Sequence, residues 1–291
     1  MRKKWDLRRI LTLCLGGFWL LDGILQLQPA MFTQAFISTV LAPNLQNQPA
    51  IIENIVAFGI HLFSTNLFWW NLASALLQVF IGIILIFPFQ ERVQRVGLWL
   101  SVVWAFVIWI FGEGFGNIFT GSATFYTGAP GSALLYLILA LCLLYPFYER
   151  LPMIAGMIFI LDALLNLTPM FWQPTMLSML AMTPSVSTAL GTFGAHGTMI
   201  GNLIAIDALM LLGLLLIFIA NRSVGWIAIG FLLLIWSVSQ SFGGIQTFPF
   251  GTATDPNSAP LLILFLLPII LPQADVASKG ARNRGGSGQG S

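Results

Sequence analysis

The sequence contains few charged residues. Asp, Glu, Lys and Arg make up only 8% of its 291 positions, whereas 57% of the residues are hydrophobic. A soluble domain of this size needs a polar exterior around its core, and this composition cannot supply one. The shortage of charge therefore excludes a soluble globular protein and predicts that most of the chain lies in a lipid bilayer. The formal net charge of +2 gives no indication of a nucleic acid partner.

Cysteine and histidine are also scarce. Cys14 and Cys142 both fall inside apolar segments, so a disulfide is not expected. His61 and His196 raise the hypothesis of haem ligation, but they do not occupy matching positions of the repeat described below. We therefore predict no metal site. The sequence also lacks a Gly-rich phosphate loop, a nucleophile–base pair and zinc-ligand spacing, which argues against hydrolase or kinase chemistry and leaves open whether the chain is an enzyme.

Long apolar stretches dominate what is present. A helix needs about 20 apolar residues to cross the hydrocarbon core. Segments that approach this length lie at 10–28, 67–88, 97–119, 132–148, 152–168, 199–220, 223–241 and 259–272. Lys and Arg occur only at the termini and in alternate connections, and the connections 29–60, 112–131, 168–198 and 241–258 contain neither. Because cytoplasmic loops retain Lys and Arg, this pattern predicts eight membrane crossings with both termini in the cytoplasm, in the plasma membrane of a prokaryote.

The two parts of the sequence resemble each other. NLASALLQVFIGIILIF at 71–87 matches NLIAIDALMLLGLLLIF at 202–218 without a gap, and related matches join 21–32 to 161–171 and 112–120 to 239–247. Each unit has an even number of predicted crossings, so both enter from the same side and the repeats are parallel. We predict an all-α integral membrane protein with eight transmembrane helices, arranged as two parallel four-helix repeats at 1–150 and 151–273, and a flexible cytoplasmic tail at 274–291.

The first outer connection is long enough to have structure of its own. Asn47 is a candidate cap for a helix that begins at Pro49. A single helix over 49–88 would be about 60 Å long, twice the thickness of the membrane core. We therefore expect its first part to lie at the interface, to tilt strongly, or to break from the rest.

Several polar residues fall inside or next to the predicted crossings, where an ionisable side chain marks an interior contact by default. Asp22 lies 13 residues beyond Arg9, about 20 Å along a helix, which places it in the outer half of the bilayer. Its match in the second repeat is Asp162. We predict a ligand-binding site that opens outward and is formed by Asp22, Gln26, Asn71, Glu113, Asp162, Asn166, Asn202, Asp207 and Gln240.

Asp22 and Asp162 also have a structural interpretation. Helices usually stop before a proline, and the two residues precede Pro29 and Pro169. In this interpretation the carboxylates cap broken helix ends. Contact with a partner subunit is a third alternative.

The stretches GGFWLLDGILQLQP at 16–29 and QVFIGIILIF at 78–87 resemble the DoxX/DoxD-like family of four-helix membrane proteins. The family carries an acidic residue where Gln78 stands here and where Leu209 stands in the second repeat. The resemblance implies an accessory subunit of a quinone-linked sulfur or thiol oxidation system. It also implies a quinone as ligand and a separate redox partner protein. Independently of the resemblance, a second copy of the chain is a further candidate partner.

Two other classes of function stay open. Parallel repeats with interior polar residues are typical of alternating-access transporters of small solutes. The cytoplasmic halves of the predicted helices contain almost no polar residues that could line an inward path, which argues against transport. A structural membrane scaffold needs no site at all.

Overall fold

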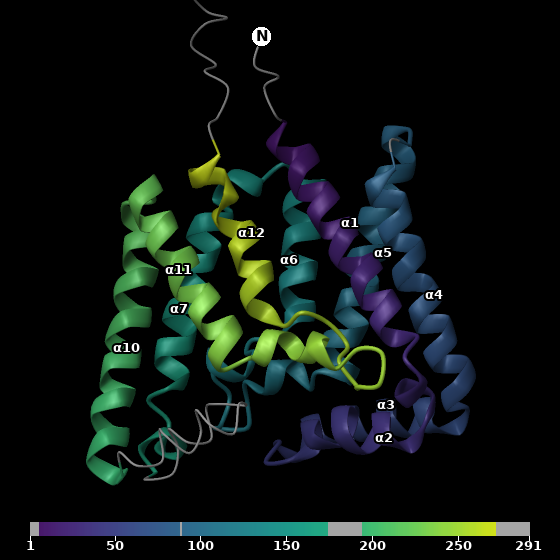
Figure 1. Ribbon diagram of the computed structural model, residues 1–291, viewed down its shortest axis with the longest axis horizontal. Helices are drawn as coiled ribbons and strands as arrows, with labels where there is room; N and C mark the ends of the chain where they lie inside the picture. The colour runs from purple at the N-terminus through teal and green to yellow at the C-terminus, as the bar shows by residue number, and fades with distance from the viewer. Residues whose placement is uncertain (1–5, 88, 174–193, 272–291) are drawn as a thin grey trace, which may run out of the picture.

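The computed structural model describes residues 6–87, 89–173 and 194–271, and within these ranges every regular element is helical. Long helices run side by side, and short helices cross one end of the bundle (Figure 1). The first helix begins and the last helix ends at the opposite end of the bundle. The predicted all-α class is confirmed. The predicted tail at 274–291 lies outside the described residues.

The helices group into a first half and a second half, before and after residue 150. Those of the first half are α1 (Leu7–Gln26), α4 (Leu67–Ile86), α5 (Glu91–Val107), which continues as the π-helical η4 (Ile108–Gly112), and α6 (Ser132–Leu144). Those of the second half are α7 (Leu151–Leu165), α10 (Gly194–Phe218), α11 (Arg222–Val238) and α12 (Ser258–Ile270). In each half the first two helices pack together and so do the last two. The halves meet where α12 contacts α6 and α1.

Each predicted crossing coincides with one of these helices, but not all of them are long enough to span a bilayer alone. In the part of the chain that the structure describes, four segments have the length and hydropathy of a membrane span, Leu7–Gln26, Leu67–Ile86, Glu91–Gly112 and Gly197–Phe218. A fifth would be α11 together with η9 (Ser241–Thr247), which is bent by 49°. Helices α6 and α12 have only 13 residues each, or about 20 Å. Proline limits α6, because Pro130 precedes it and Pro146 follows it.

The first outer connection folds into short helices that lie across the end of the bundle (Figure 1). Of the three expected arrangements the break is present, because α3 ends at Thr65 and Asn66 leaves the helical region with φ −155° and ψ 70°. The predicted Asn47 cap is wrong. Asn47 itself has a φ of 57°, and Pro49 occupies the capping position without a side-chain hydrogen bond. These elements are η1 (Pro29–Phe32), α2 (Gln34–Phe36), the π-helical η2 (Ile37–Leu41), η3 (Ala42–Leu45) and α3 (Ala50–Thr65).

Glycine pairs bring the first two helices of each half into close contact. A Cβ atom on Gly82 would lie 2.8 Å from the carbonyl oxygen of Gly16, and one on Gly213 would lie 2.7 Å from that of Gly156. Small residues at such crossings let helix backbones approach in a membrane, where packing replaces the hydrophobic effect. A side chain at any of these positions would push the paired helices apart.

Arginines at helix starts bind the last carbonyls of neighbouring helices. Arg9 donates from Nη2 to the carbonyl of Ile86 at 2.6 Å, and Arg222 donates from Nη2 to that of Ile270 at 2.9 Å. These bonds satisfy acceptors that a helix end leaves free, and they place positive charge at the negative ends of α4 and α12. They also place Arg9 and Arg222 at the same end of the bundle.

Candidate functional site

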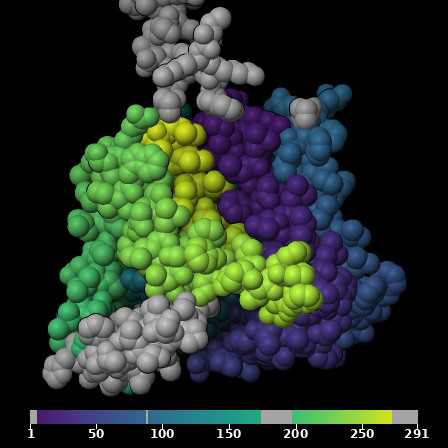
Figure 2. Space-filling model, viewed as in Figure 1, coloured from purple at the N-terminus to yellow at the C-terminus, as the bar shows by residue number. Residues whose placement is uncertain are grey.

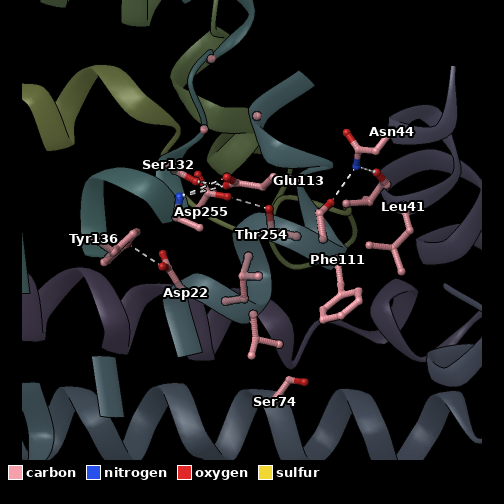
Figure 3. A pocket seen from close by; sticks show the side chains of 18 of the residues that line it. Asp22, Leu41, Asn44, Ser74, Phe111, Glu113, Ser132, Tyr136, Thr254 and Asp255 are labelled. Carbon is pink, nitrogen blue, oxygen red and sulfur yellow. Dashed lines mark hydrogen bonds between the residues drawn. The ribbon is translucent and has the colours of Figure 1, made fainter. Parts of the chain in front are cut away.

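A cavity of about 320 Å³ lies inside the first half. Its walls come from α1, α4, α5 and α6. Its cover comes from the first outer connection, from the connection 112–131, and from Thr254, Asp255 and Asn257 of the second half. Figure 3 shows Asp22, Glu113, Tyr136 and Asp255 around it. A cavity of this size is typical of sites for small ligands held mainly by apolar contact.

Asp22 lies at one wall of the cavity and accepts a hydrogen bond from a tyrosine hydroxyl. The side chain is 3% exposed, and its Oδ2 accepts a hydrogen bond from the hydroxyl of Tyr136 on α6. The Tyr136 ring packs 4.4 Å from the ring of Trp19, whose Nε1 donates to Ser101 Oγ at 2.8 Å. Asp22 is therefore held by a row of buried polar side chains that links α1, α5 and α6.

Glu113 follows the span Glu91–Gly112 and binds the start of α6. Its Oε1 accepts from Ser132 Oγ at 2.6 Å and from the Ala133 amide at 3.0 Å. A carboxylate at a helix N-terminus meets free amides and the positive end of the dipole. Burial, with a smaller contribution from the nearby Asp255 carboxylate, nevertheless raises the pKa of Glu113 from 4.5 to about 7.

The third carboxylate reaches the cavity from the second half. Asp255 accepts from Thr254 Oγ1 at 2.8 Å and from the Asn257 amide at 2.7 Å. Its loop is anchored on the first half, because Gln28 Nε2 donates to the carbonyl of Ala253 at 2.9 Å. Figure 2 shows the yellow-green segment that leads into this loop lying against the first half. The site is therefore composite, and the second half contributes to it.

Three buried polar atoms at the cavity have no hydrogen-bond partner among the described residues. They are Asp22 Oδ1 on α1, Gln78 Oε1 on α4 and Trp104 Nε1 on α5. A buried donor or acceptor without a partner costs about 1–3 kcal/mol, so such atoms are uncommon in folded proteins. The three atoms belong to residues of separate helices that line one cavity. Five further buried polar atoms without a partner lie elsewhere among the described residues, including Asp162 Oδ2 and Asn166 Oδ1 in the second half.

The corresponding region of the second half is filled by protein. Phe125, from the loop before α6, is fully buried and packs 5.9 Å from Phe159, which packs in turn 6.1 Å from Phe231. Asp162 Oδ1 accepts from the Phe125 amide, and Gln240 Nε2 donates to the Phe125 carbonyl at 2.9 Å. The predicted site residues Asp162 and Gln240 thus hold a loop of the first half.

The structure divides the predicted site residues into separate groups. Asp22, Gln26 and Glu113 line the cavity, and Asp162, Asn166, Asn202 and Gln240 are buried in the second half. Asn71 Nδ2 donates to the Gln26 carbonyl at 3.0 Å, and Asn202 Nδ2 donates to that of Asn166 at 3.1 Å. These amides close helix ends rather than face the cavity. Asp207 lies on an exposed face of α10, so the predicted cluster is not one site.

The capping interpretation of the two aspartates is not what the structure shows. Asp22 binds a tyrosine hydroxyl on another helix, and Asp162 binds a backbone amide of a distant loop. Neither of these hydrogen bonds is to the turn that follows its own helix. The carboxylates instead join elements that are far apart in the sequence.

The prediction missed Trp19, Trp104, Tyr136 and Asp255, and it did not place Gln78 in the site. A position-by-position comparison of the two halves would have found the first three. Trp19 aligns with Phe159, Trp104 with Phe231 and Tyr136 with Leu262. Aromatic side chains that carry a polar group in the first half therefore correspond to apolar side chains in the second. Asp255 has no such signal, because only the fold brings its loop to the first half.

The described side chains contain no group of His, Cys, Asp and Glu that could hold a metal ion. His61 is exposed, and the side chain of His196 lies outside the description. Cys14 and Cys142 are both free thiols.

Comparison with known proteins adds no identification, because no family model, curated protein or solved structure matches the chain.

Proposed function

We propose that this membrane protein binds one small amphipathic molecule, of the quinone and quinol class, in the cavity of its first half. The observation that carries this proposal is that three residues lining that cavity, Asp22, Gln78 and Trp104, each have a buried polar atom without a hydrogen-bond partner among the described residues. A quinone head group is a flat ring with polar oxygens at its edges. Aromatic walls and a few hydrogen-bonding groups suit such a ring.

The proposed role is that of an accessory subunit in a redox system. In this role Trp104, Asp22 and Gln78 bind and orient the ring, and a partner protein exchanges electrons with it. The partner and the link to sulfur or thiol oxidation rest on the family resemblance alone.

The proposal includes eight membrane crossings in two parallel repeats, with both termini in the cytoplasm of a prokaryotic cell. Matched contacts support it. Trp109 Nε1 donates to the Pro130 carbonyl at 2.9 Å, and Trp236 Nε1 donates to that of Pro256 at 2.7 Å. Short helices such as α6 would complete their crossings with the flanking turns.

Binding is tested with the full-length protein in lipid nanodiscs. Titration with a short-chain benzoquinone and its quinol should raise the unfolding temperature of the wild type, and a ligand at 100 times its Kd adds about 2.7 kcal/mol. Gln78→Leu should abolish the shift, because it replaces the amide with the residue found at the matching position, Leu209. No shift with either form would contradict the proposal. Solute flux into proteoliposomes that depends on Asp22 would favour transport instead.

Topology is tested by cysteine labelling in a background without Cys14 and Cys142. A cysteine at the exposed Asn47 should react with an impermeant thiol reagent applied to intact cells, and one at the exposed Gln90 should not. Labelling at Gln90 alone would reverse the orientation.

A further inference from the structure

Asp207 places a carboxylate in the middle of a membrane span. The span Gly197–Phe218 has 22 residues, and Asp207 lies about 15 Å from either end of it. The residue is exposed on the surface of α10, and its side chain makes no hydrogen bond with the described residues. Long Lys and Arg side chains near a helix end can reach the membrane surface, but the short Asp side chain cannot do so from this depth.

Asp207 belongs to a row of exposed residues along α10. Successive members of the row are four or three residues apart in alternation, which is the seam of a helix that packs along a second helix. In Figure 1, α10 lies at the edge of the bundle, where it packs on α7 and α11 with its other sides. The five apolar members of the row are between 40% and 78% exposed, and they are Ile200, Ile204, Leu211, Leu214 and Phe218.

The matching row of the first half is entirely apolar. It lies on α4, at the opposite edge of the bundle (Figure 1), where Leu76 stands at the position of Asp207 and is 56% exposed. Lipid alone explains such a face, because hydrocarbon accepts apolar side chains. It does not explain Asp207, because an ionised carboxylate is costly in hydrocarbon unless another group pairs with it. The exposed members of the row on α4 are Trp69, Ala73, Leu76, Phe80 and Ile83.

The group that pairs with Asp207 has to come from another protein. The 12 Lys and Arg residues of this chain lie in its terminal segments or at or near helix starts, far from the middle of a span. A second copy of the chain in the same orientation therefore brings no Lys or Arg to the depth of Asp207. It would bring a second Asp207, and two carboxylates repel each other.

We infer that the face of α10 formed by Asp207 and the five apolar residues of its row is the docking surface for a transmembrane helix of another protein, and that this helix carries a Lys or Arg at the depth of Asp207. The carboxylate accepts charge-assisted hydrogen bonds from that cation, and the apolar residues on both sides of it pack against the helix. No residue of α10 lines the cavity. The inference therefore goes beyond the proposed function and does not depend on ligand binding.

The test uses the full-length protein in lipid vesicles together with synthetic helices of defined charge. Each peptide is a leucine-rich transmembrane helix of about 20 residues, with Lys, Leu or Glu at its centre, where the depth of the side chain is the same in both orientations. Binding is measured by energy transfer from a fluorophore on a cysteine at the exposed Ser223, in a background without Cys14 and Cys142. We expect the Lys peptide to bind about tenfold more tightly than the Leu peptide, the effect of one polar contact between helices in a membrane. The Glu peptide should bind no more tightly than the Leu peptide.

Substitutions of Asp207 assign this preference to its charge. Asp207→Leu installs the residue of the matching position, Leu76, and should remove the preference for the Lys peptide without changing the affinity for the Leu peptide. Asp207→Glu keeps the charge and should keep the preference, whereas Asp207→Asn keeps the size of the side chain and should lose most of it. Leu76→Ala, on the matching face of α4, is the control and should change none of the affinities.

The outcomes are distinct. Equal affinities for the Lys and Leu peptides, or a preference that persists in Asp207→Leu, would overturn the inference. Self-association of the labelled protein that Asp207→Leu abolishes would also overturn it, because a second copy of the chain would then cover this face. The quinone titration reports separately on the proposed function, so either result can fail while the other stands.

Discussion

The first half surrounds a cavity lined by apolar side chains and several polar ones, whereas in the second half a buried aromatic cluster lies among the matching residues. Trp19, Gln78 and Trp104 align with Phe159, Leu209 and Phe231, so the polar walls of the first half become apolar in the second. Phe125, which is fully buried, packs against Phe159 of this set. The comparison teaches that two stretches of similar sequence can differ in the polar side chains that they place at matching positions.

The halves also exchange loops. Phe125 of the first half is bound by Asp162 and Gln240 of the second, and Asp255 of the second half lies at the cavity of the first. The two loops differ in what they contribute. The loop of the first half contributes the large apolar ring of Phe125, and the loop of the second half contributes the small polar turn at Asp255. The second half is therefore a support that completes the site rather than a second site.

The largest expected effect comes from removing the buried Phe125 ring, which packs in the second half. Phe125→Ala removes a fully buried ring and leaves a cavity, which should cost about 3–5 kcal/mol of unfolding free energy. Thermal unfolding of the purified protein in detergent measures the loss as a lower midpoint temperature. Phe250→Ala is the control, since Phe250 is 84% exposed. An unchanged midpoint for Phe125→Ala would show that the ring does not hold the halves together.

The next effect comes from the hydrogen bond on Asp22. Tyr136→Phe keeps the ring but removes the hydroxyl that donates to Asp22 Oδ2. Because Asp22 Oδ1 already has no partner among the described residues, neither oxygen of this buried carboxyl group would then have a hydrogen-bond donor there. We expect a loss of about 1–3 kcal/mol, measured by the same unfolding assay. Tyr145→Phe, at a side chain that is 50% exposed, should have little effect. Equal losses in the two variants would contradict the special role of Tyr136.

A smaller effect should depend on pH through Glu113. Its pKa is raised from 4.5 to about 7 in the folded protein. The folded state therefore binds the proton more tightly than the unfolded state, and stability should fall as pH rises from 4.5 through about 7. The slope is at most about 1.4 kcal/mol per pH unit, and partial solvent access reduces it.

Glu113→Gln tests this dependence, because it installs the residue of the second half, where Gln240 accepts from the Ala259 amide at 3.2 Å. The variant should lose the pH-dependent part of the stability while keeping the contact with α6. The unfolding midpoint temperatures of the wild type and the variant are compared between roughly pH 4 and pH 8, a range that spans the ordinary and the raised pKa of Glu113. Parallel curves would contradict the assignment of the titration to Glu113.

The smallest effect concerns Trp104. Trp104→Phe also installs the second-half residue, and it removes a buried donor that lacks a partner. Without ligand the variant should be as stable as the wild type or more stable by up to about 1 kcal/mol. Quinone affinity should fall, because Trp104 Nε1 is the donor that a carbonyl would use. A gain in stability with unchanged quinone affinity would remove Trp104 from the site.

The sequence predicts the positions of the helices well. A helix inside a bilayer needs a long apolar run, and arginine is found in alternate connections between these runs. Their lengths were less predictable. Proline shortens α6, and the break at Asn66 divides a continuous apolar run into α3 and α4. Only the contacts made after folding decide where such a run stops.

The site was partly predictable for a different reason. Asp22 and Glu113 are costly inside or beside a membrane helix, so their presence alone indicates interior contacts. Asp162 carries the same signal but binds the Phe125 loop, and Asp207 carries it on an exposed face. A carboxylate in an apolar run thus predicts that some contact exists, and the tertiary structure decides which one.

A density map of the protein, purified in nanodiscs and saturated with methylhydroquinone under anaerobic conditions, tests the central claim most directly. The account predicts ligand density in the first half, in contact with Asp22, Gln78 and Trp104, with Phe125 still filling the second half. Density that replaces Phe125 in the second half, or none in the first half at saturation, would contradict it.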